Sequence, residues 1–356
     1  MLFVKELVES AGRLTRVPSK YVFETTKSDD CMVVDPVSEP ETIKIPIIDY
    51  SLMTSGNPDQ RSQVINELRN ACLEWGFFMV INHGVGETLR DELMRATESF
   101  FDLSMEEKLK YTGKKLFDPI KCGTSFNPNV EKSLLWRDYL KLLVHPHFNA
   151  PHKPSHFSKI LQEYSKKTRE MASELLKGIS ESLGLDENYI NEKMGVESEK
   201  WTQVLVANMY PPCPQPELSI GLPPHSDHGL LTILMQNDPS ILGLQVLHNA
   251  KWVPIHPLPN SFLVNTGDHM EILTNGKYKS VVHRAVVNNK TTRISIGTAH
   301  GPPLDKIVSP APELLANGVG TQLSLPAYRG IKYRDFLELQ QSKSLNGKSC
   351  LDCLRL

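Results

Sequence analysis

The chain has 356 residues, of which 40% are hydrophobic and 22% charged, and its 39 basic and 41 acidic residues give a formal net charge of -2. This balance excludes extensive disorder, a membrane-protein composition and charge-driven binding of nucleic acid, and it favours a small-molecule partner. The N-terminal apolar run is too short for a signal peptide, and no run of about 18 apolar residues is present to span a bilayer, so we expect a monomeric, cytoplasmic protein with no membrane partner.

The first half of the chain is predicted to be mainly helical. Apolar residues at spacings of three to four predict amphipathic helices, and short β-rich runs bounded by turn residues predict strands. The expected helices cover residues 4–14, 61–75, 87–101 and 155–183, and the expected strands cover 45–49 and 77–82.

After residue 201 the pattern changes to short β-rich runs separated by Pro, Gly and Asn, which predicts an antiparallel sandwich or barrel. Asn275-Gly276 is the strongest hairpin signal in the chain. The fold class is therefore α+β, with helices that support a β-sheet core. Seven strands are expected, at 204–209, 230–235, 243–247, 252–255, 261–265, 280–287 and 293–298, and a helix is expected at 333–343.

His225-Ser226-Asp227 is a candidate pair of metal ligands. On an extended segment residues i and i+2 point to the same side, so an imidazole and a carboxylate are delivered together. Two histidines and one carboxylate on one face of the metal are typical of non-haem Fe(II) enzymes. His283 is the candidate third ligand, although a lone histidine in such a run is more often a core residue.

His269-Met270-Glu271 has the same form and is a rival. If Asn275-Gly276 forms a two-residue turn, His283 pairs with residue 268, and the rival side chains face the other way. A one-residue slip would reverse this inference. Cys350 and Cys353 form a lone Cys-x-x-Cys pair, which we interpret as coincidence rather than as a redox or zinc site.

Arg293-Ile294-Ser295 is a candidate carboxylate-binding pair. Strand alternation puts the guanidinium and the hydroxyl on one face, where the N–H donors of arginine can hold a carboxylate at two points. Viewed alone, Arg293 is equally compatible with an exposed arginine that pairs with a neighbouring carboxylate of the protein.

The order of these residues is more specific than any one of them. His283 lies 56 positions after Asp227, and Arg293 lies ten positions after His283. In this order, and in the segments 75–78, 82–84, 208–214 and 263–268, the chain resembles the plant-type 2-oxoglutarate- and Fe(II)-dependent dioxygenases.

The resemblance implies a double-stranded β-helix, or jelly-roll, core with Fe(II) between its sheets. It implies that His225, Asp227 and His283 bind the iron, which carries the oxidant without a separate acid or base from the protein. It implies 2-oxoglutarate and O₂ as co-substrates and ascorbate as a stimulant of activity. The residues it assigns to 2-oxoglutarate are Arg293, Ser295 and Tyr210, at the distal carboxylate, and Asn208, near the metal-chelating end.

The resemblance also predicts the domain organisation. The expected segments are an N-terminal extension (1–43), a mainly helical N-terminal dioxygenase domain (44–150), a helical connection (151–200), the Fe(II)/2-oxoglutarate jelly-roll domain (201–305) and a C-terminal helical tail (306–356).

The substrate is expected to be a bulky plant specialised metabolite, such as an alkaloid, steroid or terpenoid, which the enzyme hydroxylates. Flavonoid-oxidising relatives tend to carry an aromatic and an acidic residue where this chain has Ala299 and Gly301, and Lys where it has Val206. The segments 118–127 and 223–229 resemble a branch that includes steroidal-alkaloid oxidation. Asp227 makes halogenation improbable. Further pocket candidates are Phe126, Trp136 and Leu140.

Four alternatives remain. Within the same family, the chain could be a flavonoid or phenolic hydroxylase or desaturase, or an O-demethylase. Outside it, a non-catalytic jelly-roll binding protein would have no need of all three ligands together with Arg293 and Ser295. A zinc hydrolase would not need the Arg-x-Ser pair and would want a general base close to the metal.

Overall fold

The structure is a computed structural model that describes residues 3–10, 14–23, 45–113, 115–127, 131–196, 198, 200–316, 325–343 and 345–356. Most of the predicted N-terminal extension and the end of the predicted 4–14 helix therefore lie outside the described residues. The helices are α1 (Val4–Ser10), α2 (Tyr50–Ser55), α3 (Pro58–Asn70), α4 (Glu87–Phe101), α5 (Met105–Leu109), α6 (Phe157–Ser182), α7 (Tyr189–Met194), α8 (Asp268–Leu273), α9 (Pro312–Ala316), α10 (Tyr333–Ser342) and α11 (Ser349–Asp352), with 3-10 turns η1 (Ser19–Tyr21) and η3 (Pro216–Leu218) and a π-helical turn η2 (Ala71–Trp75).

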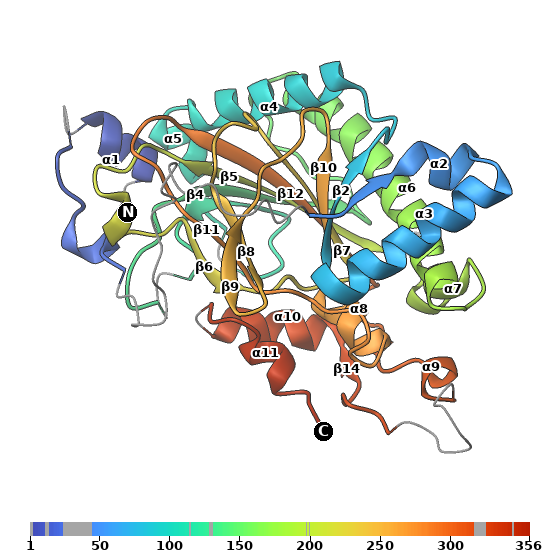
Figure 1. The fold of residues 1–356 in the computed structure, drawn as a ribbon. Helices are drawn as coiled ribbons and strands as arrows, with labels where there is room; N and C mark the ends of the chain where they lie inside the picture. Colours follow the sequence, from blue (N-terminus) through green and yellow to red (C-terminus); the bar gives the residue numbers. More distant parts are fainter. Residues whose placement is uncertain are drawn as a thin grey trace.

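The strands form two facing sheets and one short ribbon (Figure 1). The main sheet has the order β1-β2-β10-β7-β12-β5-β4-β3, the minor sheet has the order β6-β11-β8-β9, and β13 pairs with β14. This is the jelly-roll core that was predicted. The strands are β1 (Ile47–Asp49), β2 (Phe77–Ile81), β3 (Ile120–Thr124), β4 (Asp138–His145), β5 (Thr202–Tyr210), β6 (Leu222–His225), β7 (Leu231–Gln236), β8 (Leu244–His248), β9 (Lys251–Pro254), β10 (Phe262–Thr266), β11 (His283–Ala285), β12 (Arg293–Gly301), β13 (Ile307–Val308) and β14 (Ile331–Lys332).

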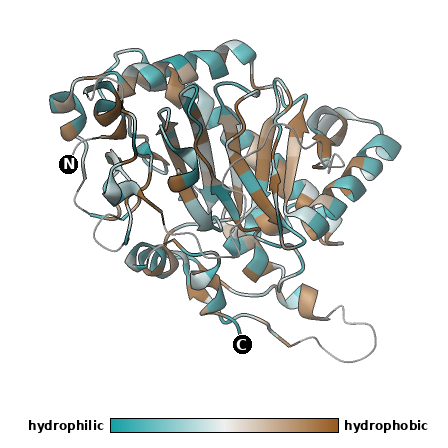
Figure 2. Ribbon diagram, turned by 60° about the vertical axis from the view of Figure 1, so that its left-hand side comes forward, coloured by the Kyte–Doolittle hydropathy of each residue, from teal (hydrophilic) through white to brown (hydrophobic). Residues whose placement is uncertain are grey.

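The helices α3, α4 and α6 cover the outer face of the main sheet (Figure 1). Apolar side chains of α6 recur at helical spacing and pack with alternate residues of the sheet, such as Leu205, Ala207 and Ile296, in one large core. Figure 2 shows this pattern, with apolar residues concentrated in the strands and polar residues on the outer sides of the helices. The inner face of the main sheet is left to face the minor sheet, and the candidate site lies there.

Local signals explain several of the correctly predicted elements. α3 begins with a capping box, in which the Asn57 side chain accepts a hydrogen bond from the Gln60 N–H and the Gln60 side chain accepts one from the Asn57 N–H. Pro58 occupies the first helical position. The helical stretch ends at Gly76, whose φ of 60° is in the left-handed region. A side chain there would meet the Lys279 carbonyl oxygen, so this turn requires glycine.

The hairpin predicted at Asn275-Gly276 is wrong. Residues 268–273 form the helix α8, and both Asn275 (φ 53°) and Gly276 (φ 81°) have positive φ because they end that helix. The Gly276 N–H donates to the Glu271 carbonyl and the Asn275 N–H donates to the Ile272 carbonyl, which is a Schellman cap. The register inferred from a two-residue turn is therefore not formed.

Five of the described strands were not predicted, namely β3, β4, β6 and the two-residue strands β13 and β14. β6 reads Leu-Pro-Pro-His, and proline is tolerated because β6 is an edge strand of the minor sheet. β3 and β4 form an antiparallel hairpin at one edge of the main sheet. Together with β1 and β2 they supply half of that sheet, so the proposed boundary between an N-terminal and a jelly-roll domain crosses one continuous sheet.

No helix within the described ranges is long and apolar enough to cross a membrane.

Candidate active site

The two predicted histidine ligands lie on neighbouring strands of the minor sheet. His225 ends β6, His283 begins β11, and the two residues are directly paired in the antiparallel ladder. Asp227 follows β6, and its Oδ1 lies 3.7 Å from His225 Nε2 and 3.6 Å from His283 Nε2. Among the described residues these three form the one cluster whose ligand atoms are close enough to share a metal ion.

Backbone carbonyls orient both imidazoles in the same way. His225 Nδ1 lies 2.8 Å from the Pro223 oxygen and His283 Nδ1 lies 3.1 Å from the Val281 oxygen, two residues earlier in each case. A donating Nδ1–H leaves the Nε2 lone pair of each ring directed at the centre of the cluster. The Asp227 carboxylate is oriented in turn by the Asn265 amide, which donates to Oδ2 at 3.0 Å.

The electrostatics of the cluster favour the protonation states that a metal requires. Burial, with a contribution from His283, lowers the pKa of His225 to about 3, so its imidazole is neutral. Burial would raise the pKa of Asp227, but His283, His225 and the bond from Asn265 outweigh it and lower this pKa to about 2. A neutral imidazole from His225 and an ionised carboxylate from Asp227 therefore converge with the ring of His283, and two imidazoles with one carboxylate are the donor set of non-haem Fe(II) sites.

The predicted carboxylate-binding residues lie opposite this cluster on the main sheet. In the antiparallel pairing of β12 with β5, Arg293 lies opposite Tyr210 and Ser295 lies opposite Asn208. All four side chains therefore share two adjacent rungs on the inner face. Each of the four is at least 90% buried.

Arg293 is held in position from two sides. Its Nε and Nη2 donate to Gln236 Oε1 at 3.1 and 3.0 Å, and its guanidinium lies 5.3 Å from the centre of the Tyr210 ring. Its Nη1 is buried without a hydrogen-bond partner. Burial lowers the pKa of this arginine from its ordinary value, while Tyr210 acts in the opposite sense. A buried cation with an unpaired N–H fits an anionic ligand such as one carboxylate of 2-oxoglutarate.

One cavity of about 260 Å³ contains both groups of residues. His225, Asp227 and His283 line it from the minor sheet, and Arg293, Ser295, Tyr210 and Asn208 line it from the main sheet. Three of the predicted pocket residues, Phe126, Val206 and Ala299, are also in its lining.

The other three predicted pocket residues do not line this cavity, and these predictions are corrected. Trp136 is fully buried elsewhere, where its Nε1 donates to the Pro211 oxygen at 3.0 Å and its ring packs edge-on against Tyr21. Leu140 points into the helical core because it alternates with the cavity-facing residues of β4. Gly301 lies at the end of β12, against the hydroxyl of Tyr333.

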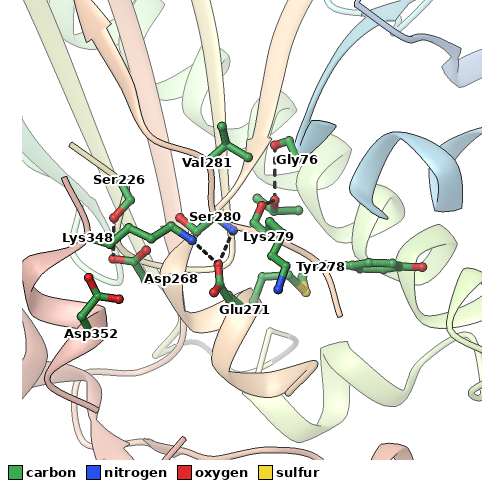
Figure 3. Close-up of polar contacts among 12 residues, drawn as sticks. Gly76, Ser226, Asp268, Glu271, Tyr278, Lys279, Ser280, Val281, Lys348 and Asp352 are labelled. Carbon is green, nitrogen blue, oxygen red and sulfur yellow. Dashed lines mark hydrogen bonds and ion pairs between the residues drawn. The ribbon is translucent and has the colours of Figure 1, made fainter. Parts of the chain in front are cut away.

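The rival pair is not a metal site, although the register argument against it was wrong. His269 and Glu271 are buried in α8, and the His269 ring packs edge-on against Tyr333 and Phe336. The Glu271 carboxylate accepts from the Ser280 N–H at 2.8 Å and pairs with Lys348 (Figure 3). Its oxygens are therefore occupied by structural partners.

Glu271 also fastens the C-terminal segment to the site. Besides Lys348, it pairs with Arg355 at 3.3 Å. Beside these ion pairs, the Gly347 N–H donates to the Pro224 oxygen at 2.8 Å, next to His225. The segment from 345 to 356 thus packs behind β6, the strand that carries His225. Cys350 and Cys353, in or next to α11, are both free thiols.

Two other histidines are structural. His83 bonds through Nε2 with the Asn260 oxygen at 2.9 Å. His228 lines the cavity, but its Nδ1 bonds with the Tyr333 hydroxyl at 2.7 Å, and it is not in the metal-ligating cluster.

Several residues that line the cavity or orient its side chains were missed from the sequence. Gln236 and Asn265 orient Arg293 and Asp227, and nothing in their local sequence indicates this. Lys121 and Lys141 line the cavity from β3 and β4. Lys141 was detectable, because alternate apolar residues in 138–145 indicate a strand whose other face would carry it.

Comparisons with known proteins agree with this geometry. Residues 201–302 match the 2OG-Fe(II) oxygenase superfamily, and residues 45–163 match the family described as non-haem dioxygenase in morphine synthesis N-terminal. The chain is 47% identical to 2-oxoglutarate-dependent dioxygenase 19 of Oryza sativa subsp. japonica, over 88% of this chain and 90% of that protein. It is 36% identical to thebaine 6-O-demethylase of Papaver somniferum, over 98% and 95% of the two chains. The crystal structure of JOX2 in complex with 2OG, Fe and JA superposes with a TM-score of 0.84 at 29% identity, covering 100% of this chain and 98% of that one.

Proposed function

Because the chain belongs to the 2OG-Fe(II) oxygenase superfamily, whose members are oxidoreductases that use Fe(II) and 2-oxoglutarate, we propose that His225, Asp227 and His283 hold its iron. We further propose that Arg293 and Ser295, with Tyr210 and Asn208, hold its 2-oxoglutarate. The observation that carries the proposal is the shared cavity. The three-ligand cluster on one sheet and the two rungs on the other both line it.

When bound, Fe(II) with 2-oxoglutarate and O₂ supplies the oxidation of a substrate C–H bond, with succinate and CO₂ as co-products. The chain contributes binding and orientation. Arg293 offers its unpaired Nη1 to the distal carboxylate, while Gln236 and Tyr210 fix the guanidinium plane. Asn265 fixes Asp227, so the carboxylate keeps its place when the substrate enters.

The apolar residues of the cavity limit the access of water to the reacting centre. Val206, Ala299, Leu234 and Phe77 lie around the co-substrate and metal residues, and apolar atoms dominate the surface of the cavity. No side chain with an obvious acid or base role is needed, because the oxidation of a C–H bond is supplied by the cofactor.

The substrate we propose is a bulky plant specialised metabolite, of the alkaloid, steroid or terpenoid type, that is hydroxylated. Val206 and Ala299 support it, since both are small apolar residues facing the cavity; Gly301 no longer does, because it lies against Tyr333. The cavity volume of about 260 Å³ is just below the usual range for small-molecule sites, so part of a large skeleton would lie at its mouth. The predicted cytoplasmic location and monomeric state belong to the same proposal.

The test is coupled turnover of 2-oxoglutarate by the purified protein. Anaerobically reconstituted protein receives Fe(II), ascorbate, 2-oxoglutarate and O₂, and succinate is measured with a panel of candidate substrates. Arg293→Ala should lose 2-oxoglutarate binding but keep iron, whereas His225→Ala should lose both. If no substrate stimulates succinate formation, or if Arg293→Ala leaves 2-oxoglutarate binding intact, the proposal fails.

The same experiment separates the alternatives. A jelly-roll binding protein would bind the ligand without forming succinate, and a zinc hydrolase would be active without O₂. Mass spectrometry of the product distinguishes hydroxylation (gain of one oxygen), desaturation (loss of two hydrogens) and O-demethylation (loss of a methylene unit).

A further inference from the structure

Two lysines face the cavity from adjacent strands of the main sheet. Lys121 of β3 and Lys141 of β4 are directly opposite in the antiparallel register, so both side chains are on one face. The alternation of β4 shows which face this is. Lys141 and its neighbours Tyr139 and Leu143 line the cavity, whereas the residues between them are buried in the helical core.

This placement costs stability when the cavity holds no anion. Like charges directly opposite on paired strands repel each other, and both side chains are only partly exposed to water. Burial, with a contribution from Lys121, lowers the pKa of Lys141 to about 8. Burial also lowers the pKa of Lys121, which the nearby Asp118 opposes. Charged pairs with perturbed pKa values of this kind are concentrated at functional sites, so the two lysines are candidates for a binding role.

Lys141 has no acidic partner among the residues that the structure describes. None of the ion pairs found there involves it, and Asp118, the carboxylate next to Lys121, accepts a bond from the Lys115 N–H. Arg137, four residues before Lys141 and also in the lining, is a further cation, engaged with Asn208 and the Ser125 oxygen, whereas the carboxylate of Asp227 lies with His225 and His283 on the opposite side of the cavity. The outer part of the cavity therefore carries an excess of positive charge.

The lysines are too far along the sheet to belong to the co-substrate rungs. Lys141 pairs with Val206 of β5, and Val206 pairs with Gly297 of β12, two residues beyond Ser295. Neighbouring strands are about 4.8 Å apart, so the Lys141 Cα lies roughly 10 Å from Gly297 across the sheet. Arg293 already supplies the cation for 2-oxoglutarate. The excess charge at Lys141 is thus placed for a second anion, in the part of the cavity left for the primary substrate.

We propose that the primary substrate carries a carboxylate, which pairs with Lys141 while the rest of the molecule lies on the apolar floor around Val206 and Gly297. Lys121 adds to the positive electrostatic potential at the carboxylate, and Asp118 reduces it. The inference rests on the proposed function, because it assumes that this cavity holds the molecule to be oxidised. It selects acids of the terpenoid or steroid type over alkaloid bases, since Lys121 and Lys141 would repel an ammonium group.

The test measures binding without turnover. The protein with Fe(II) and 2-oxoglutarate is titrated anaerobically, in a calorimeter, with cinnamic, naphthylacetic and abietic acids and with the methyl ester of each. These probes differ in size, and each pair differs only in charge. An ion pair of this kind should favour at least one acid over its ester by about ten- to a hundred-fold.

Variants of the lysines assign the preference to residues. Lys141→Gln should abolish the preference for the acid while leaving the affinities for the ester and for 2-oxoglutarate unchanged, and Lys141→Arg should restore it. Lys121→Gln should reduce it. Lys166→Gln, in an exposed position of α6, is the matched control and should change nothing.

Three results would overturn the inference: no acid binds, esters bind as tightly as acids, or Lys141→Gln keeps the preference. Succinate formation in air without any primary substrate tests the proposed function separately. A protein that consumes 2-oxoglutarate but shows no preference for acids would refute the carboxylate and leave the oxygenase proposal standing. A protein that prefers acids but never forms succinate would do the opposite.

Discussion

Gly243 is expected to set the position of Arg293, the residue that we propose binds 2-oxoglutarate. It precedes β8, and a Cβ added to it would lie 2.6 Å from Arg293 Cδ and 2.7 Å from Arg293 Nε. Real Cβ atoms essentially never approach so closely, and the guanidinium is already tied to Gln236 and packed on Tyr210. The substitution Gly243→Ala should therefore displace Arg293 while leaving the metal cluster untouched.

The size of the effect follows from the displacement. The Arg293 side chain has to move by about 0.8 Å to bring its Cδ from 2.6 Å to an ordinary contact of 3.4 Å with the new methyl group. Misplacement by about 1 Å costs on the order of 100-fold in well-oriented sites, and the loss of one bond to a charged group costs about 1.5 to 3 kcal/mol. We expect the KM for 2-oxoglutarate to rise by roughly 10- to 100-fold, with little change in iron affinity.

The assay is succinate formation as a function of 2-oxoglutarate concentration, together with calorimetric binding of Fe(II) and 2-oxoglutarate. Gly86→Ala is the matched control, because a Cβ at Gly86 meets nothing within 4 Å and its φ is -57°. An unchanged KM in Gly243→Ala would refute the reasoning. So would an equal loss of iron, which would mean that the substitution disturbs the fold rather than the arginine.

Three further predictions concern stability. Glu271→Gln should lower the free energy of unfolding by about 2 to 4 kcal/mol in urea, because it leaves Lys348 and the half-exposed Arg355 without their carboxylate; an unchanged midpoint would contradict this. Gly76→Ala should lower the midpoint temperature of thermal unfolding by several degrees, because the φ of 60° and the adjoining Lys279 carbonyl both disfavour a side chain at this position. Burial, with His228 contributing, lowers the pKa of His269 to about 3. As pH falls from 6.5 towards 3, the unfolded chain therefore binds a proton at this histidine that the folded chain does not bind, and the free energy of unfolding falls. His269→Phe should remove up to about 1.4 kcal/mol per pH unit of this slope in urea titrations, and a variant with the wild-type slope would refute the assignment.

The spacing of apolar residues predicted the long helices well because these helices are amphipathic. α4 was predicted with its observed bounds, and α6 differs by two residues at its start and one at its end, since each buries one face and exposes the other. α8 could not be found in this way. All six of its residues are buried, the polar Asp268, His269 and Glu271 included, so polar residues in its sequence do not mark a solvent-exposed face. The Asn275-Gly276 pair that ends it carries the same positive φ angles that a hairpin turn would need.

The part of the candidate site that could be predicted is the set of residues that follow one another in a characteristic order along the chain. The positions of His225, Asp227, His283, Arg293 and Ser295 in sequence led to residues that the structure brings to one cavity. The side chains that orient them could not be predicted in this way. Gln236 reaches Arg293, and Asn265 reaches Asp227, only through the pairing of the sheets, which no local pattern specifies.

The outer pocket was harder still, because facing direction changes with every residue of a strand. Leu140 was selected where its neighbours Tyr139 and Lys141 face the cavity. Since a shift of one position exchanges core and cavity, a pocket residue can be predicted only when the strand itself has been identified.

The register of the main sheet also bears on how such a protein can diverge. The rungs Arg293–Tyr210 and Ser295–Asn208 are separate from the next rows along the same strands, Gly297–Val206–Lys141 and Ala299–Val204–Leu143. Each row is a short list of side chains that share a surface but belong to different strands. Duplicated genes can therefore accumulate changes in the outer rows, and acquire new substrates, without losing the ancestral oxidising machinery.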